Sequence, residues 1–423
     1  MSIDTIANDT DHGPASHGLL AAGLAALGIV YGDIGTSPLY AFKVALIAAA
    51  GTATPTAAHA LGVLSLIIWS LLIVISLKYV VFVMRADNHG EGGILALLAL
   101  LKPWSGKDGQ RRRAVLATGI FGAALLYGDG VITPAISVMS AVEGLDVVTP
   151  MFAHYVKLLT AVILIALFVL QRRGTAKIGN LFGPVMVMWF FTIAVLGVAG
   201  IARAPQVLRA IDPFYAIDLM RQGGAATLLV FGAVFLAVTG GEALYSDMGH
   251  IGRQPIRMMW FVLVLPALLL NYAGQAALIL AEPGTIGNPF FRLAPTALAL
   301  PVVVLATAAT VIASQALISG VFSLTRQAIH MGMLPRMRIF QTSAEGYGQI
   351  YLPVVNWGLM AMTLVVVMLF KNSDSLAAAY GIAVSGTMVI TAILLYLAMR
   401  EVWHWPATIA VPLTVVVIAV DGS

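Results

Sequence analysis

Long apolar stretches separated by short polar loops run through nearly the whole chain. A helix needs about 20 mostly apolar residues to cross a bilayer. The stretches that meet this need, with loose ends, are 19–48, 60–84, 114–141, 153–171, 179–201, 224–250, 257–281, 295–325, 351–370, 375–399 and 405–420. The pattern therefore predicts an all-α polytopic membrane protein with eleven spans.

The orientation of these spans follows from the Lys and Arg residues in the loops, because loops on the cytoplasmic side carry the excess of positive charge. With the N-terminus inside, the inside loops hold 15 of the 23 Lys and Arg residues and the outside loops hold 6. Lys43 and Lys78 lie in or near spans and are left out of this comparison. The bias predicts a cytoplasmic N-terminus, and the basic run 111–113 is a topology signal rather than a nucleic-acid site.

Composition agrees with a membrane protein: 60% of the residues are hydrophobic and only 10% are charged, where soluble proteins have about 25% charged residues. The chain has no cysteine, which excludes disulfides and thiolate metal sites. Residues 1–18 are polar and predict a disordered cytoplasmic tail, so the transmembrane domain is expected to span residues 19–421.

Three spans carry a carboxylate in the middle: Asp33, Asp129 and Glu242. A charge at the bilayer centre costs about 2.5–3.5 kcal/mol on insertion scales, so three of them indicate a shared hydrated cavity. Apart from Lys43, no Lys or Arg is expected mid-span as a partner. The missing counter-charge should then be a ligand, and that ligand should be a cation.

Asp33 lies in the segment 31–40, which holds two glycines, Thr36, Ser37 and Pro38. A proline inside a helix removes a hydrogen-bond donor and displaces the carbonyl four residues back. Free carbonyls are tolerated at membrane depth only where they face protein or water, and discontinuous helices at the midplane mark transporter sites. We expect a broken first span that offers oxygen atoms to a cation.

The third and sixth spans repeat this arrangement. Asp129, Thr133 and Ser137 are spaced to share one helix face, and Glu242 follows Thr239 and two glycines. Interruptions in spans one and six are typical of two five-helix halves. An odd number of spans in each half makes the second half inverted relative to the first.

Oxygen ligands without a His or Cys cluster favour a hard cation over a transition metal. Potassium is selected by the number and field of the oxygen dipoles around it, and Tyr40 and Tyr380 could add phenolic oxygens. Three carboxylates and one monovalent cation leave excess negative charge, and burial and like charge favour the protonated form of a carboxyl group. We therefore expect proton-coupled potassium import, with Glu242 or Asp129 as the proton carrier.

The residues at these positions resemble a known family. The segment 28–40 is similar to the signature of the potassium uptake permeases, the KUP/HAK/KT family of the amino acid–polyamine–organocation superfamily. Further segments resemble the same family at 88–93, 127–137, 143–145 and 239–249. The resemblance covers nearly the whole chain.

The resemblance implies two inverted five-helix repeats with helices 1 and 6 broken, as in the LeuT-like fold, and proton-driven potassium symport in a bacterial inner membrane. The residues it implies for potassium binding or proton coupling are Asp33, Tyr40, Asp129, Thr133, Thr239, Glu242 and Tyr380. Members of the family usually have a twelfth span and a cytoplasmic C-terminal region, which are expected to be absent here. The resemblance implies that these parts serve assembly or regulation, so their expected absence counts against the homodimer that the family otherwise suggests. No cofactor is expected beyond the transported potassium ion and proton.

The sequence also has to be compared with three other classes of function: an amino acid or polyamine permease, a potassium channel and an enzyme. An amino acid or polyamine permease would share the architecture, although mid-span acids would repel an amino acid carboxylate. A potassium channel would need a carbonyl-lined filter, and no run similar to Thr-Val-Gly-Tyr-Gly is present. An enzyme is disfavoured, because no nucleophile–base pattern, metal motif or phosphate loop occurs.

Overall fold

A computed structural model describes residues 18–87, 91–101, 109–172, 176–223, 227–282, 287–342 and 350–421. The expected N-terminal tail lies outside these residues apart from Gly18, and so does part of the 88–93 segment.

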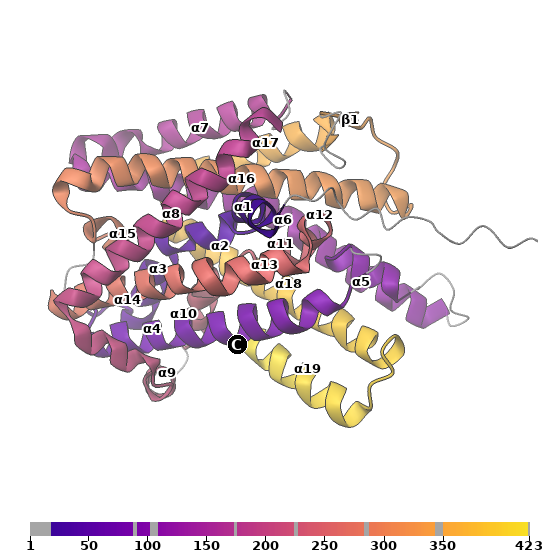
Figure 1. The fold of residues 1–423 in the computed structure, drawn as a ribbon, viewed down its shortest axis with the longest axis horizontal. Coiled ribbons are helices and arrows are strands. Elements are labelled where there is room, and N and C mark those ends of the chain that lie inside the picture. The colour runs from indigo at the N-terminus through magenta and orange to yellow at the C-terminus, as the bar shows by residue number, and fades with distance from the viewer. Residues whose placement is uncertain are drawn as a thin grey trace, which may run out of the picture.

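The described part of the chain is a bundle of helices of unequal length (Figure 1). The α-helices up to residue 223 are α1 (Leu19–Ile29), α2 (Gly32–Thr36), α3 (Ala41–Ala50), α4 (Ala57–Ser70), α5 (Ile94–Leu100), α6 (Gly109–Val148), α7 (Val156–Gln171), α8 (Ala176–Arg203) and α9 (Phe214–Gly223). Those that follow are α10 (Thr227–Phe235), α11 (Gly241–Ser246), α12 (Met248–Ile251), α13 (Arg253–Met259), α14 (Leu265–Ala281), α15 (Pro289–Arg292), α16 (Ala299–His330), α17 (Pro353–Leu369), α18 (Ser373–Glu401) and α19 (Ala407–Asp421).

Tighter and wider helical turns join several of these helices. The 3-10 segments are η1 (Ser37–Leu39), η3 (Val83–Arg85), η5 (Pro150–Tyr155), η6 (Pro205–Ile211), η8 (Leu236–Val238) and η10 (Thr296–Leu298), and the π-helical segments are η2 (Leu71–Phe82) and η9 (Trp260–Val264). Two short strands, β1 (Phe340–Gln341) and β2 (Ile350–Tyr351), pair antiparallel with Phe340 opposite Tyr351. They lie at one end of the bundle (Figure 1).

Every predicted span coincides with helical structure, but the count of eleven stays a prediction. Within the described residues, seven helices are long and apolar enough to cross a membrane, or eight if α1 and the α2–η1 segment form one bent span. The remaining predicted positions hold shorter apolar helices, among them α7, α17 and most of α19. An all-α polytopic architecture is therefore confirmed.

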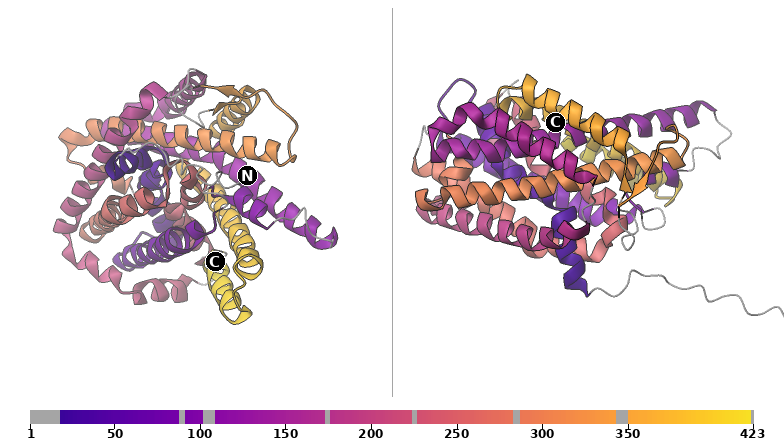
Figure 2. Two further views of the ribbon diagram at one scale, coloured as in Figure 1. Left: turned by 45° about the vertical axis from the view of Figure 1, so that its right-hand side comes forward. Right: turned by 90° about the horizontal axis from the view of Figure 1, so that it is seen from above.

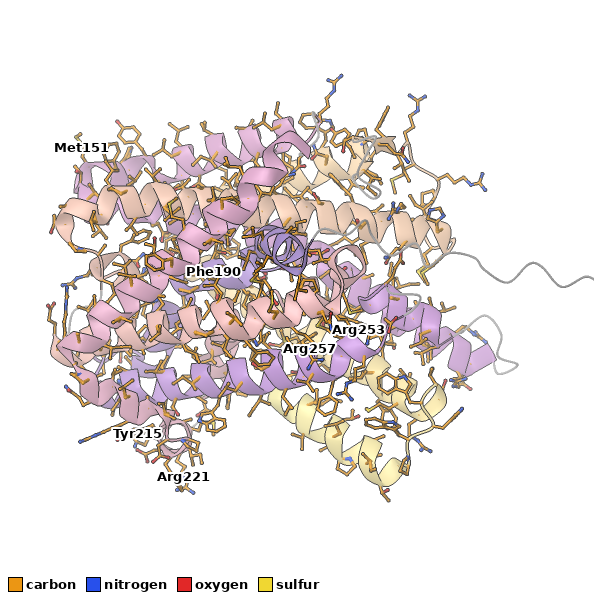
Figure 3. The ribbon with its side chains drawn as sticks, viewed as in Figure 1. Met151, Phe190, Tyr215, Arg221, Arg253 and Arg257 are labelled. Atoms are coloured by element: carbon orange, nitrogen blue, oxygen red, sulfur yellow. The ribbon has the colours of Figure 1, made fainter. Side chains whose placement is uncertain are left out.

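The outer surface of the bundle is apolar, as expected for contact with lipid. Large hydrophobic side chains such as Phe191, Val262 and Leu369 are mostly exposed. Figure 3 places Met151 and Arg221 at one end of the bundle and Arg253 toward the other.

The α6 helix has 40 residues and is about 60 Å long. It therefore exceeds the hydrocarbon core of a bilayer, which is about 30 Å thick.

The first span is broken where the sequence predicts. The α1 helix ends at Ile29, and the following α2–η1 segment is bent from it by 62°. The bend brings Gly32 against α16, where an added Cβ atom would lie 2.7 Å from the Cα atom of Ala313. Only glycine permits this approach, so α2 lies in the middle of the bundle.

The sixth span is broken at Thr239 and Gly240. Thr239 is extended, and Gly240 has a φ of +88°, which is favourable only for glycine. A Cβ atom at Gly240 would lie 3.0 Å from the backbone nitrogen of Ile34 and 3.2 Å from Oδ2 of Asp33. The two helix breaks therefore face each other.

The long helices α6, α16 and α18 surround this centre. α19 packs against α18 and lies at the periphery of the bundle (Figure 2). α8 and α14 approach closely at Gly197 and Gly274, where a Cβ on Gly274 would lie 2.7 Å from the Cα atom of Gly197. Such small-residue contacts are typical of helix packing in membranes.

Candidate functional site

Asp33 lies in the broken segment of the first span and is 4% exposed. Neither of its carboxylate oxygens has a hydrogen-bond partner among the described residues. Most buried polar groups in proteins have such a partner, and an unpaired buried charge is costly. Asp33 therefore needs a partner that the described protein groups do not provide.

The backbone carbonyls around Asp33 are largely satisfied by side chains. Pro38 cannot donate to the carbonyl of Ile34, and the hydroxyl of Ser37 donates to it instead at 2.8 Å. Trp189 Nε1 donates to the carbonyl of Gly35 at 2.8 Å, and Gln275 Nε2 donates to that of Pro38 at 3.0 Å. The expected supply of free backbone oxygens is thus reduced, and the Asp33 carboxylate is the main unpaired acceptor of the segment.

Asp129 on α6 forms a three-membered polar cluster with Thr133 and Tyr380. Thr133 Oγ1 and the Tyr380 hydroxyl each lie 2.5 Å from Asp129 Oδ1, and they lie 2.5 Å from each other. Thr133 is one helical turn from Asp129, as its spacing predicts, while Tyr380 reaches the cluster from α18. Ser137 is also buried, but its hydroxyl has no hydrogen-bond partner among the described residues.

These groups lie around one centre. Asp33 interacts electrostatically with Asp129, and Tyr40 interacts with both. The hydroxyl of Tyr40 faces Thr239 but makes no hydrogen bond of normal geometry within the described residues. The structure therefore brings together six of the predicted site residues: Asp33, Tyr40, Asp129, Thr133, Thr239 and Tyr380.

Glu242, the seventh predicted residue, has different neighbours. Its Oε1 atom accepts a hydrogen bond from the hydroxyl of Tyr79, and the carboxylate interacts electrostatically with Lys78. Gly240 faces Asp33, whereas Gly241 packs against Tyr79. The left-handed turn at Gly240 therefore directs Glu242 toward η2.

The expectation that no base other than Lys43 lies mid-span is wrong. Lys78 is buried on η2, and its Nζ atom lies 2.5 Å from Oδ2 of Asp421 and 3.4 Å from the carbonyl oxygen of Met388. Sequence reasoning missed the Lys78–Asp421 pair. The signal was a single Lys between apolar residues of the second span, a position where an unpaired charge would be costly.

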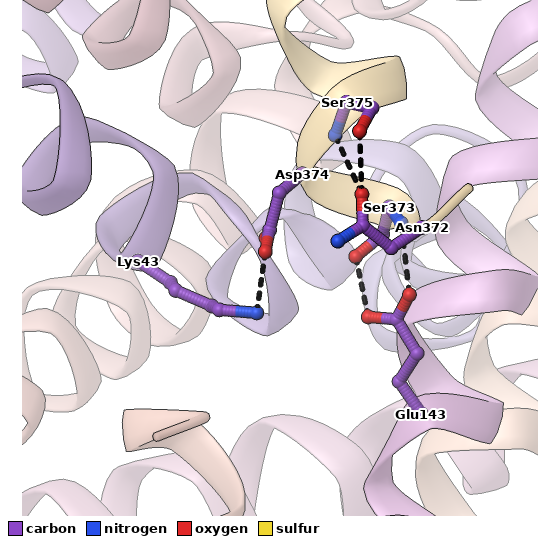
Figure 4. Close-up of polar contacts among 6 residues, drawn as sticks. All are labelled: Lys43, Glu143, Asn372, Ser373, Asp374 and Ser375. Atoms are coloured by element: carbon purple, nitrogen blue, oxygen red, sulfur yellow. Dashed lines mark hydrogen bonds and ion pairs between the residues drawn. The ribbon is translucent and has the colours of Figure 1, made fainter. Parts of the chain in front are cut away.

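A second polar cluster lies farther along the same helices (Figure 4). Lys43 Nζ on α3 lies 2.7 Å from Oδ2 of Asp374. Glu143 on α6 accepts hydrogen bonds from the backbone nitrogen and the hydroxyl of Ser373, at 2.8 and 2.5 Å. This outer cluster, defined by Lys43, Glu143, Ser373 and Asp374, fixes the start of α18, the helix that carries Tyr380.

Comparison with known proteins decides the family. A family model described as "K+ potassium transporter integral membrane domain" matches residues 20–423. The chain belongs to this family. It is an integral membrane protein, and the KUP/HAK/KT resemblance of the sequence is thereby confirmed.

Several bacterial members of this transporter family are closely similar to the chain. A "Probable potassium transport system protein Kup 1" from Geobacter sulfurreducens is 57% identical over 418 residues, which cover 98% of this chain and 66% of that protein. A "Probable potassium transport system protein Kup" from Nitrosomonas eutropha is 56% identical over 415 residues, covering 98% of the chain and 64% of the relative. The chain thus spans slightly less than two thirds of the length of these relatives.

Proposed function

We propose that this chain imports potassium as a secondary active transporter, by proton-coupled symport with alternating access. The observation that carries the proposal is the Asp33 carboxylate, which is buried at a helix break with both oxygens unpaired among the described residues. Membership of a potassium transporter family and the names of the relatives support potassium as the cation. The carboxylate of Asp129 beside Asp33 favours a cationic substrate over an amino acid.

In this proposal, potassium binds between the two helix breaks. Asp33 provides the charge, and Tyr40, Thr133, Thr239 and Tyr380 provide neutral oxygens around it. Asp129 lies beside these groups, where its carboxylate is already held by Thr133 and Tyr380. With Asp33 and Asp129 both ionised, two negative charges would face a single monovalent ion. Binding of that ion would therefore depend on a proton that neutralises one of the two carboxylates.

Glu242 is the second candidate proton carrier. Its carboxylate lies against Tyr79 and near Lys78, rather than in the cluster around Asp129. A proton that moves on or off Glu242 would change the charge balance with Lys78 and Asp421, and so the packing of η2 against α11. This arrangement supports a coupling role for Glu242 more than direct potassium binding.

The wider architecture completes the proposal. Breaks in spans one and six support two inverted five-helix repeats of the LeuT-like type. The excess of Lys and Arg in alternate loops supports a cytoplasmic N-terminus, and the bacterial relatives support an inner-membrane location. A homodimer rests on the family resemblance alone and is tested by native mass spectrometry of the purified protein.

The function is tested by potassium uptake into liposomes that contain the purified chain. We expect uptake that saturates with potassium and increases when the outside is made acidic relative to the inside. Uptake that is indifferent to the pH gradient would remove proton coupling, and competition by putrescine but not by rubidium would replace potassium with a polyamine. Asp129→Asn and Glu242→Gln, compared in the same assay, separate the two candidate proton carriers: the carrier variant loses the response to the gradient.

A further inference from the structure

A small cavity, with room for about one water molecule, lies directly beside Asp33. Its walls are mostly apolar and include Val30, Leu126 and Leu317. Besides Asp33, the acidic residue in its lining is Asp247, at the end of α11. The cavity therefore joins the broken segment of the first span to the far end of the broken sixth span.

Asp247 resembles Asp33 in lacking a partner. It is 7% exposed, and no hydrogen bond or ion pair joins its carboxylate to another residue that the structure describes. The nearby Asp87 differs, because Arg253 lies 2.7 Å from it. Asp247 is thus a largely buried residue whose carboxylate has no partner among the described residues, and it shares an apolar cavity with Asp33.

The residues that line the cavity show on which side of the Asp33 centre it lies. In the first span it is lined by Ile29 and Val30, which precede Asp33, whereas Lys43 of the outer cluster follows it. In α6 it is lined by Leu126, which precedes Asp129, whereas Glu143 lies 14 residues beyond Asp129, or about 21 Å along the helix. The cavity and the outer cluster therefore lie on opposite sides of the Asp33 centre.

We propose that Asp247 forms a second binding site for the transported monovalent cation, between Asp33 and the compartment on the α1 side. A cation that leaves Asp33 must pass through the cavity. The apolar walls of the cavity do not replace the favourable hydration that the ion loses there. A carboxylate in a low-dielectric cleft offsets this loss and concentrates cations in the cleft. This inference rests on the proposed cation transport for the identity of the ion. With the N-terminus inside, Asp247 is a release site for import.

The chain has no cysteine, so one introduced thiol reports on the cavity. Gly320→Cys is the first reporter, because Gly320 lines the cavity and a Cβ atom there meets no atom within 4 Å. Ser246→Cys is a second reporter from α11. Gly109→Cys, at the exposed start of α6, marks the α1 side. The measurement is the rate of modification by positively and negatively charged methanethiosulfonates, in vesicles of each orientation.

We expect the reporter thiols to react from the same side as the Gly109→Cys marker, and faster with the positive reagent. Combining either reporter with Asp247→Asn should lower the ratio of positive to negative rates by about fivefold. Potassium should slow the positive reagent only when Asp247 is present. Glu401→Gln removes a surface carboxylate that pairs with Arg111 outside the cavity, and it should leave the ratio unchanged. A ratio that is the same with and without the Asp247→Asn substitution, or thiols that neither orientation modifies, overturns the site.

Potassium transport measured from each side of the membrane provides a second test of the Asp247 site. Asp247→Asn should raise the half-saturating potassium concentration on the α1 side by about tenfold, while the value on the opposite side changes less than about twofold. Equal changes on both sides contradict a side-specific site. If the unmodified chain moves no potassium, the proposed function fails, and the labelling ratios still decide whether the cavity holds cations through Asp247.

Discussion

Two regions of the bundle hold carboxylates in opposite ways. In the outer cluster, both oxygens of Glu143 accept hydrogen bonds from Ser373, and Asp374 pairs with Lys43 (Figure 4). At the helix break, neither oxygen of Asp33 has a partner among the described residues. In the first arrangement protein groups satisfy the acids, and in the second no described protein group does, which is why we propose a ligand for Asp33. Acidic residues in membrane helices are therefore distinguished by their partners and not by their depth alone.

The largest effect should follow substitution of the unpaired carboxylate. Asp33→Asn should reduce potassium uptake in liposomes by at least about 100-fold, because a charged partner of the cation is typically worth several kcal/mol when buried. The same change should leave the melting temperature in potassium-free buffer equal or higher, since it removes an unpaired charge. A large fall in the melting temperature would show that Asp33 is a structural residue like Glu143.

Gly240 sets the distance between the two breaks. Gly240→Ala should destabilise the protein by about 1–2 kcal/mol through its positive φ alone, and the new Cβ would press on Ile34 and Asp33. Potassium uptake should fall with stability. Gly358→Ala on α17 is the matched control, because its Cβ meets no atom within 4 Å and helix propensity favours Ala by about 1 kcal/mol. Equal thermal unfolding curves for the two variants would contradict the close approach.

Tyr380→Phe removes one of the two hydroxyls that lie 2.5 Å from Asp129 Oδ1. A hydrogen bond to a charged group is worth about 1.5–3 kcal/mol, so the half-saturating potassium concentration should rise by about tenfold or more. Maximal uptake should change less. An unchanged half-saturation value would mean that Asp129 and Tyr380 stabilise only the packing of α6 against α18.

The smallest effect is expected in the outer cluster. The Lys43–Asp374 pair is partly exposed, with side chains 19% and 23% accessible, and such pairs contribute about 0–1 kcal/mol. Lys43→Met should therefore lower the melting temperature only slightly and leave half-saturation with potassium within about twofold. A change as large as that of Asp33→Asn would end the distinction between the two regions.

Local sequence was sufficient for the helices and for both breaks. Glycine and proline at 32–38 and the two glycines at 240–241 predict interruptions, and the structure has breaks at Tyr31 and Gly240. The spacing of Asp129 and Thr133 also predicts their contact. These features depend on neighbours in the chain, which a sequence displays directly.

Contacts between residues far apart in the chain could not be predicted from local sequence. Lys78 and Asp421 are 343 positions apart, and the sequence around either residue does not predict that the two form a pair. The direction of Glu242 depends on the left-handed turn at Gly240, so its position beside Tyr79 could not be read from its depth in a span. Asp247 lies near the end of a predicted span, a position typical of a solvated residue, yet it is buried in the cavity beside Asp33.

The Asp33 carboxylate has no hydrogen-bond partner among the described residues, and we propose that a potassium ion is its partner. Isothermal titration of the purified chain with potassium, in a buffer containing only a bulky organic cation, tests this claim directly. We predict saturable binding to the unmodified chain and no measurable binding to Asp33→Asn, while Lys43→Met binds as the unmodified chain does. Equal potassium binding by the unmodified chain and by a folded Asp33→Asn variant would show that the Asp33 carboxylate does not hold the ion.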